Sequence, residues 1–388
     1  MANLNMNADA IRISADKTVA DWKALRVRLI ESAPRFATPD VEEVFNLFKV
    51  RIETRFLRPI HRILEIRENL GEGMAAAALE CILIEHLEAT FQGKLYAEPR
   101  SAEEIKELAG VLRVSDAAAA KLTQPCRYIS SASLFESFLT RHEPFNRYFN
   151  KRSASVFFTK VRCGLLHEAA TKDQTVVRKE CAKDPNQPVE MRGNRNLILY
   201  RTPFLRGIEE CLARFRQELS ANPERVIGLI RKLDEICQIP KVFYFAYGRN
   251  LNRQILKQRA GRWVWAQSAA VADFKVVFDK QGLDGTKANL SESPNTNVWG
   301  VCYELDALEG ELGFENLKQS EAGYEIRDVL VSFPPIKEQF IAKTFIAIES
   351  VKSQRPSRDY LDDILTGAKD WQLPKEYIEQ LKRAAEYH

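Results

Sequence analysis

The pattern of apolar and polar residues changes once along the chain, close to residue 240. Between residues 19 and 112, apolar residues recur three and four positions apart, as in "VEEVFNLFKVRIETRFLRPIHRILEIRENL" and "GMAAAALECILIEHLEATFQG". This spacing predicts amphipathic helices, with a start or kink at Pro59. Helical patterns continue through "SDAAAAKLTQPC" to about residue 237, and "VEMRGNRNLILY" resembles a hairpin that turns at Gly193 and Asn194. We therefore expect residues 1–239 to form a mainly α-helical domain.

Short strand-like stretches separated by turn residues follow Pro240. They are "VFYFAYG", "WVWAQSAAVADFKVVFD", "NVWGVCYELD", "YEIRDVLVSF" and "QFIAKTFIAIES". The stretch "KQGLDGTKANLSESPNTN" is rich in Gly, Asn, Ser and Pro, which predicts a loop, and two short helical patterns end the chain. This order predicts a two-domain protein in which residues 240–388 form a mixed α+β domain.

The composition is that of an ordinary globular protein, with 45% hydrophobic and 28% charged residues and a net charge of +4. A chain of 388 residues is longer than one core usually supports, which agrees with two domains. No apolar run reaches the roughly 18 to 20 residues that a membrane span requires. The polar start lacks the hydrophobic segment of a secretory signal. We expect a cytoplasmic protein that does not bind a membrane.

The seven cysteines stand singly, and no two of the five histidines have helical ligand spacing. We therefore expect neither a disulfide framework nor a metal site, and no motif indicates a cofactor. The excess of basic residues lies in residues 1–239, because the remainder is nearly balanced. Such an excess is compatible with a nucleic-acid partner but is too small to indicate one by itself.

Five separated stretches of the second half resemble the γ-glutamylcyclotransferase family in their order and spacing. They are "FAYGRNLN", "ADFKVVF", "ANLSESPNTNVWGVCYELD", "LKQSEAGYEIRDV" and "SRDYLDDILTGAKDWQLPKEYIEQL". Together they cover nearly all of residues 241–388. The resemblance implies a mixed β-barrel or sheet with short helices, and a small γ-glutamyl compound as the partner.

In that family the corner between the first strand and the next helix has the form Y-G-S-N-L. The resemblance implies that its backbone N–H groups hold the carboxylate end of the substrate, since successive amides at such a turn form an anion site. Gly248 would let the backbone approach the ligand, and Asn250 tolerates unusual dihedral angles. Arg249 replaces the serine and could add a carboxylate contact or fill the pocket. The implied substrate-binding residues are Tyr247, Gly248, Arg249, Asn250, Leu251 and Tyr324.

The family's reaction is intramolecular, because the α-amine of the γ-glutamyl group attacks its own side-chain carbonyl and releases 5-oxoproline. One carboxyl group can serve as base and then as acid. The family supplies it as Glu in an L-D-x-x-E segment, which implies Glu321 in "LKQSE". Lys318 stands at the Asp position, and a shifted alignment would nominate Glu315. Binding without turnover therefore stays open, as does the identity of the leaving group.

The helical half contains Arg162 and His167, five positions apart in "FFTKVRCGLLHEAAT". On one face, the guanidinium could stabilise phosphate charge while the imidazole moves a proton. The pair resembles the R-x-x-x-x-H motif of HEPN domains, with Cys163 where members often carry a polar residue. The resemblance implies an alternative function, a metal-independent defence or toxin ribonuclease that acts on RNA as a homodimer, with residues 240–388 as a ligand sensor or regulatory module. Otherwise the helical domain would serve dimerisation or targeting.

Overall fold

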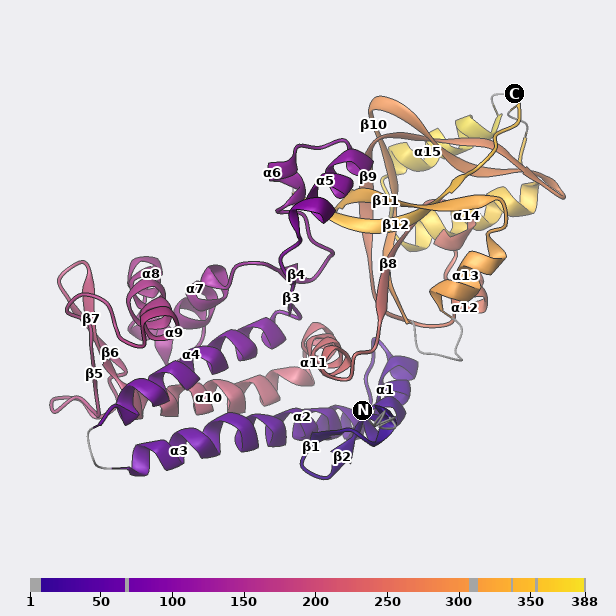
Figure 1. Cartoon of the computed structure of the whole chain (residues 1–388). Helices are drawn as coiled ribbons and strands as arrows, with labels where there is room; N and C mark the ends of the chain where they lie inside the picture. The colour runs from indigo at the N-terminus through magenta and orange to yellow at the C-terminus, as the bar shows by residue number, and fades with distance from the viewer. Residues whose placement is uncertain (1–7, 67–69, 307–312, 336–337, 353–354, 387–388) are drawn as a thin grey trace, which may run out of the picture. The chain divides into compact units, whose positions relative to one another are not determined.

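The computed structural model describes residues 8–66, 70–306, 313–335, 338–352 and 355–386. The chain divides into two compact units, Met1–Leu95 with Ser130–Cys237 and Tyr96–Ile129 with Gln238–His388. Figure 1 shows the helices and strands of each unit. None of the described helices combines the length and the apolar character that crossing a membrane requires.

Helices dominate the first unit, as the sequence predicts. They are α1 (Val19–Ser32), α2 (Thr38–Ile52), α3 (Arg58–Glu65), α4 (Glu72–Phe91), α7 (Ala132–Arg141), α8 (Lys151–Phe157), α9 (Cys163–Glu168), α10 (Arg201–Leu219) and α11 (Pro223–Ile236). A short pair of strands, β1 (Arg12–Ser14) and β2 (Lys17–Thr18), precedes α1. The π-helical turns η2 (Glu53–Leu57) and η4 (Phe158–Arg162) join α2 to α3 and α8 to α9. Pro59 lies within the continuous helical run from α2 to α3, just after the π-helical turn η2, so it does not start a separate helix.

A buried ion pair joins the first and last helices of this unit. The Nε atom of Arg26 in α1 lies 2.7 Å from Oδ1 of Asp234 in α11, and Trp22 donates to the same oxygen over 2.9 Å. All three residues are fully buried. Because a buried charge is costly without a partner, this contact specifies how α1 packs on α11.

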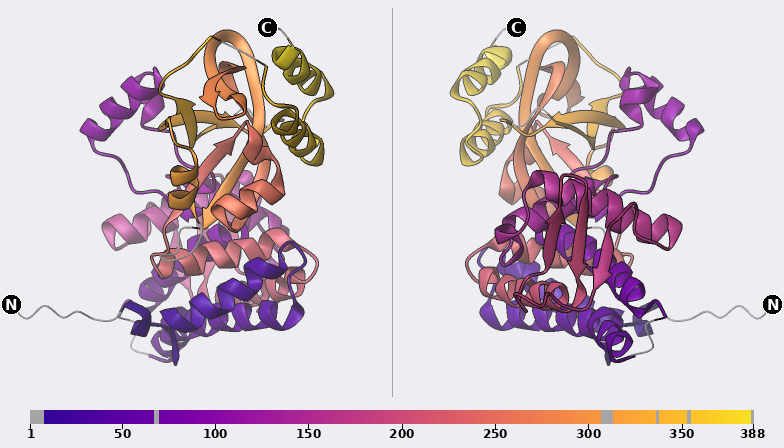
Figure 2. Two further views of the ribbon diagram at one scale, coloured as in Figure 1. Left: turned by 90° about the vertical axis from the view of Figure 1, so that its right-hand side faces the viewer. Right: turned by 90° about the vertical axis from the view of Figure 1, so that its left-hand side faces the viewer.

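The predicted hairpin of the first unit is confirmed. Strands β6 (Val189–Arg192) and β7 (Asn196–Tyr200) pair antiparallel, and Gly193 in the turn has a φ of +65°. A third strand, β5 (Val176–Arg178), runs parallel to β7, so the sheet order is β5-β7-β6. The right-hand view of Figure 2 shows the three strands side by side.

Residues 96–129 group with the second unit, whereas the sequence pattern assigns them to the first domain. Between β3 (Leu95–Tyr96) and β4 (Arg127–Tyr128), this segment forms α5 (Ala102–Leu112) and the short α6 (Asp116–Ala119). The carbonyl of Thr123 accepts a hydrogen bond from Ile341 N–H over 2.9 Å, and Arg113 lies 3.0 Å from Glu292. Helical periodicity reports local structure only, so it does not show that the segment packs on strands far away in the sequence. The predicted helix "SDAAAAKLTQPC" is helical only at Asp116–Ala119.

The second unit contains a closed five-stranded barrel of order β10-β8-β12-β11-β9. Its strands are β8 (Lys241–Ala246), β9 (Trp263–Gly282), β10 (Gly285–Asp306), β11 (Tyr324–Ser332) and β12 (Gln339–Ala347). Among the described residues of the barrel, β12 pairs with β8 in parallel, whereas β10 with β8, β9 with β10, and β11 with β12 and β9 pair antiparallel. The barrel matches the mixed barrel or sheet that the sequence predicts.

The stretch predicted as a loop, residues 280–297, is instead mostly strand. Residues 285–292 pair with residues 274–282 across the β9–β10 hairpin, and a bulge lies between Glu292 and Asn297. Strand formation depends on cross-strand partners more than on composition, so the polar residues did not prevent it. The hairpin tip reaches the cavity described below.

Short helices close the barrel and position residues 247–251, which we call the corner loop. They are η5 (Arg249–Leu251), α12 (Arg253–Ala260), α13 (Phe314–Ser320), α14 (Arg358–Asp370) and α15 (Lys375–Glu386). Both views of Figure 2 show α14 and α15, in yellow, along one side of the barrel. A Cβ atom on Gly367 of α14 would lie 2.3 Å from the backbone carbon of Leu251. The absence of a side chain at Gly367 therefore lets α14 pack directly against the corner loop.

Candidate active site

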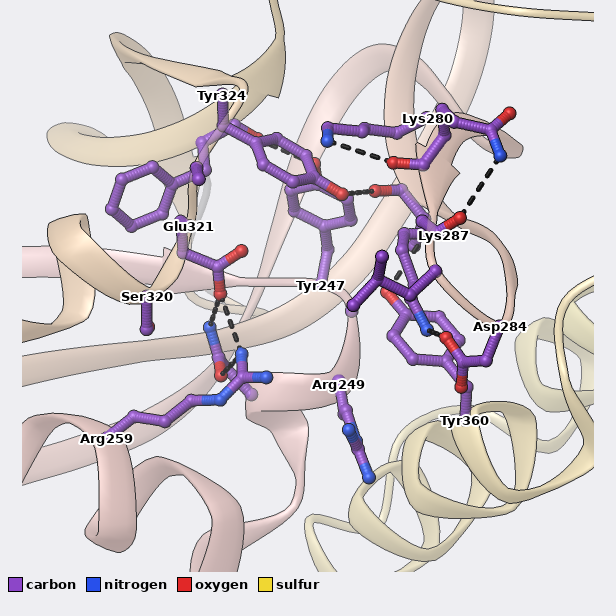
Figure 3. A pocket seen from close by; sticks show the side chains of 18 of the residues that line it. Tyr247, Arg249, Arg259, Lys280, Asp284, Lys287, Ser320, Glu321, Tyr324 and Tyr360 are labelled. Atoms are coloured by element: carbon purple, nitrogen blue, oxygen red, sulfur yellow. Dashed lines mark hydrogen bonds and ion pairs between the residues drawn. The ribbon is translucent and has the colours of Figure 1, made fainter.

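A cavity of about 500 Å³ lies beside the corner loop of the second unit. Its walls come from the corner loop, α12, the β9–β10 hairpin, the segment that joins α13 to β11, and α14. Figure 3 shows side chains from these elements directed around one space. Elements that are distant in the sequence therefore form one site within this unit.

The corner loop is a tight turn between β8 and α12. The carbonyls of Gly248 and Arg249 accept hydrogen bonds from Leu251 N–H and Asn252 N–H over 3.0 and 3.1 Å. The Asn252 side chain then caps α12 by accepting from Gln254 N–H over 3.0 Å. Gly248 has a φ of −109°, so this glycine does not provide left-handed backbone. A Cβ atom there would instead lie 3.4 Å from Cβ of Ala288, on the cavity wall.

Of the predicted loop residues, Tyr247, Gly248, Arg249 and Asn250 line the cavity. Leu251 is fully buried in the core and does not line it. The backbone N–H groups of residues 248, 249 and 250 have no hydrogen-bond acceptor within the part of the chain that the structure describes. Their role in binding an anionic group of a ligand stays a prediction.

Glu321 lies at the end of α13 and faces the corner loop. Its Oε1 atom is 2.8 Å from Nδ2 of Asn250 and 2.9 Å from Nη1 of Arg259. The same Arg259 nitrogen donates to Oδ1 of Asn250 over 3.1 Å, and Asn250 Nδ2 also donates to Tyr244 Oη over 2.9 Å. The predicted acidic residue and a predicted loop residue are therefore in direct contact.

Burial raises the pKa of the Glu321 carboxyl group above its ordinary value of 4.5, and the positive charge of Arg259 opposes this rise. Its side chain is only 14% exposed. Burial also raises the pKa of the Tyr244 and Tyr247 hydroxyls, so both stay neutral. A carboxyl group with a raised pKa exchanges protons more readily near neutral pH than an exposed one.

Glu315, the alternative acid from the shifted alignment, lies elsewhere. It is in the first turn of α13, its side chain is 77% exposed, and its carboxylate is 3.7 Å from Nζ of Lys318. Neither Glu315 nor Lys318 lines the cavity. The geometry therefore favours Glu321, and the lysine at the family's Asp position pairs with Glu315 on the surface.

Arg249 does not fill the cavity. Its Nε atom donates to Oδ2 of Asp363 in α14 over 2.7 Å, and its guanidinium carbon lies 5.9 Å from the centre of the Tyr360 ring. Figure 3 shows the side chain extending away from Glu321. The replacement of the family's serine by arginine thus links the loop to α14.

Three tyrosine rings line the cavity while their hydroxyls bond to the barrel backbone. Tyr247 donates to the carbonyl of Phe345 over 2.6 Å, and Tyr324 donates to the carbonyl of Ala288 over 2.8 Å. Tyr360 accepts from the N–H of Ala288 over 3.0 Å. Tyr324, predicted as a pocket residue, therefore lines the cavity with its ring and contacts β10 through its hydroxyl.

Several cavity residues were not identified from the sequence. Those with polar side chains that bear on the argument are Tyr244, Arg259, Lys280, Lys287 and Tyr360. Tyr360 lies in a stretch that carries the family resemblance, and Arg259 follows the corner loop closely. Neither residue belongs to a motif that would mark it as a cavity residue, because tyrosine and arginine are common on helices.

Among the described residues, Arg162 and His167 of the first unit make no contact with each other. Arg162 ends the turn η4, and its Nη2 atom lies 3.2 Å from Oε2 of Glu85 in α4. His167 lies in α9 and is exposed. Five residues of α-helix rotate a side chain by about 140° relative to the first. The geometry of a single chain therefore gives no support to the predicted ribonuclease site.

Comparisons with known proteins concern the C-terminal segment. A family model described as the AIG2-like family matches residues 297–381. The γ-glutamylcyclotransferase of Mus musculus is 31% identical over 145 residues, which are 36% of this chain and 76% of that relative. The γ-glutamylcyclotransferase of Homo sapiens is 30% identical over 145 residues, with the same shares. A solved structure named "Gamma-glutamyl cyclotransferase" is 28% identical and has a TM-score of 0.32; the match covers 37% of this chain and 87% of that chain.

Fold and site together define a class of protein, a closed barrel with a buried carboxyl group opposite a strand-to-helix loop. The chain is 31% and 30% identical to these two relatives and covers 76% of the length of each, which shows the family. The chain belongs to the γ-glutamylcyclotransferase family, which confirms the resemblance found in residues 241–388.

Proposed function

We propose that the second unit cyclises the γ-glutamyl group of a small γ-glutamyl amine or peptide and releases 5-oxoproline. The observation that carries this proposal is that the Glu321 carboxyl group and the corner-loop residues 248–250 line one cavity. The relatives of the chain are named γ-glutamylcyclotransferases, which supports the same reaction class.

Substrate binding would use the corner loop. The N–H groups of Gly248, Arg249 and Asn250 would bind the α-carboxylate of the γ-glutamyl group, since they have no acceptor among the described residues. The cavity volume of about 500 Å³ falls within the range of small-molecule sites. The tyrosine rings would exclude water around the bound group and limit how it can bend.

Glu321 would act first as a base and then as an acid. Its ionised carboxylate would take a proton from the α-ammonium group, and the freed amine would attack the side-chain carbonyl carbon. A new carbon–nitrogen bond closes the five-membered ring, and the bond to the leaving amine breaks. Glu321 would return the first proton to the leaving nitrogen as its bond to carbon breaks. The second proton lost by the attacking nitrogen would pass to the released amine, which departs as an ammonium ion, so both protons are accounted for and the enzyme is unchanged.

The test is an assay of 5-oxoproline release by the purified full chain, with γ-glutamyl amino acids, amines and isopeptides as candidate substrates. We expect turnover of at least one of them, and loss of turnover in Glu321→Gln, because an amide cannot carry the proton. Inactivity of the wild-type chain on every class of compound, with correct folding shown by circular dichroism, would contradict the proposal.

The first unit would contribute dimerisation or targeting. No contact in the described residues of one chain favours RNA cleavage by Arg162 and His167, so we do not propose it. The expected cytoplasmic location stays a prediction.

A further inference from the structure

The two oxygens of the Glu321 carboxyl group have different surroundings. Oε1 receives hydrogen bonds from Asn250 over 2.8 Å and from Arg259 over 2.9 Å. No residue in the described part of the chain donates to Oε2. Figure 3 shows Oε2 on the side of the carboxyl group that is away from Arg259, facing the cavity.

Arg259 itself is held in place by two acceptors. It projects from α12, and its Nη1 atom bridges Oδ1 of Asn250 over 3.1 Å and Oε1 of Glu321. Its side chain is 26% exposed, so it is mostly enclosed by the protein. Because Asn250 holds this nitrogen independently of Glu321, the nitrogen stays beside Oε1 and restrains rotation of the carboxyl group.

We propose that Arg259 is a positioning residue for the cyclisation, which holds Oε1 of Glu321 so that Oε2 accepts and returns the proton. This inference rests on the proposed function of the site. Arg259 would act through Glu321 and would not touch the substrate.

The other charged and titratable groups around Glu321 do not duplicate this role. Lys280 of β9 favours the charged carboxylate, but its recorded hydrogen bond goes to the carbonyl of Gln281 over 3.0 Å. Arg249 and Lys287 face the same cavity, and each pairs with an aspartate, Asp363 and Asp284 respectively. The remaining titratable groups are the hydroxyls of Tyr244, Tyr247, Tyr324 and Tyr360, whose pKa values burial raises.

Loss of Arg259 would therefore have two effects. The Asn250 amide alone would hold Oε1, so the carboxyl group would rotate more freely. The effect of burial on the Glu321 pKa would also no longer be offset by the positive charge of Arg259. The pKa would rise further, since an adjacent cation typically lowers a carboxyl pKa by about 1–3 units. At neutral pH less of the carboxyl group would be ionised and able to take the proton.

The first measurement is the pH profile of kcat and KM for 5-oxoproline release by the wild type, Arg259→Gln and Arg259→Lys. Arg259→Gln should move the acid limb of kcat up by about 1–3 pH units, with little change in KM and partial recovery at higher pH. Arg259→Lys should keep most of the wild-type profile, because it retains the charge. Arg253→Gln is the matched control, since Arg253 lies in the same helix, is exposed and does not line the cavity.

A second measurement does not depend on turnover. The Glu321 carboxyl signal, assigned by its loss in Glu321→Gln, is titrated by ¹³C NMR in the same variants. An upward pKa shift in Arg259→Gln, absent in Arg253→Gln, shows that Arg259 keeps the Glu321 carboxyl group ionised and, together with the shifted kcat profile, supports the inference. If no substrate is turned over, the proposed function fails and only this electrostatic role of Arg259 remains. An unmoved Glu321 titration, or equal shifts in both glutamine variants, would overturn the inference whether or not the wild type is active.

Discussion

The side-chain amide of Asn250 lies 2.8 Å from Oε1 of Glu321, although the two residues are 71 positions apart in the chain. The contact joins the corner loop, which would hold the substrate, to the group that would move its proton. Substrate binding and proton transfer would thereby be kept in one fixed geometry.

Replacement of Asn250 by alanine should lower kcat/KM about 10- to 100-fold. The reason is that a hydrogen bond to a charged group contributes about 1.5–3 kcal/mol, and about 1.4 kcal/mol corresponds to a tenfold change in rate. Asn297→Ala is the matched control, because Asn297 is exposed and does not line the cavity. Steady-state kinetics compare the two variants, and equal effects would show that the Asn250 contact has no part in catalysis.

The activity of the wild type should depend on pH through Glu321. Because burial raises its pKa above 4.5, kcat/KM should rise with pH through an acid limb above that value. The sign follows from the first step, in which the ionised form takes a proton. A profile whose acid limb lies at or below the ordinary glutamate pKa would mean that the acting group is not a buried carboxyl group.

Replacement of Arg249 by serine restores the family's loop pattern and should change kcat/KM by less than about threefold. The guanidinium group pairs with Asp363 and extends away from Glu321, so the chemistry does not depend on it. The effect on stability should be small, about 0–1 kcal/mol, because the pair is partly exposed. Loss of more than tenfold in kcat/KM would place Arg249 in contact with the substrate.

Replacement of Gly367 by alanine should destabilise the second unit by about 1–3 kcal/mol, because the new Cβ would lie 2.3 Å from the backbone of Leu251. Gly110→Ala in α5 is the control, since a Cβ there meets no atom within 4 Å. That change should stabilise the protein by about 0.5–1 kcal/mol, as alanine is the better helix former. Urea unfolding measures both, and changes of the same sign would contradict the packing described.

Much of the second unit could be predicted from the sequence. The strand-to-helix corner and the "LKQSE" segment carry local signals, and residues from each line the cavity. Arg259 carries no local signal. It contacts Glu321, 62 positions further along the chain, only once α12 packs near α13. For the same reason the sequence pattern places residues 96–129 in the first domain and predicts a loop at residues 280–297, whereas long-range contacts with the barrel decide their structure.

The most direct test compares Glu321→Gln with Glu315→Gln in the 5-oxoproline assay, using a substrate that the wild type turns over. Both substitutions remove one negative charge at opposite ends of α13, but only Glu321 lines the cavity. We predict that Glu315→Gln keeps at least half of the wild-type kcat while Glu321→Gln loses it by a factor of about 100 or more, in the range typical of a general acid–base residue. Retained turnover in Glu321→Gln would contradict the account.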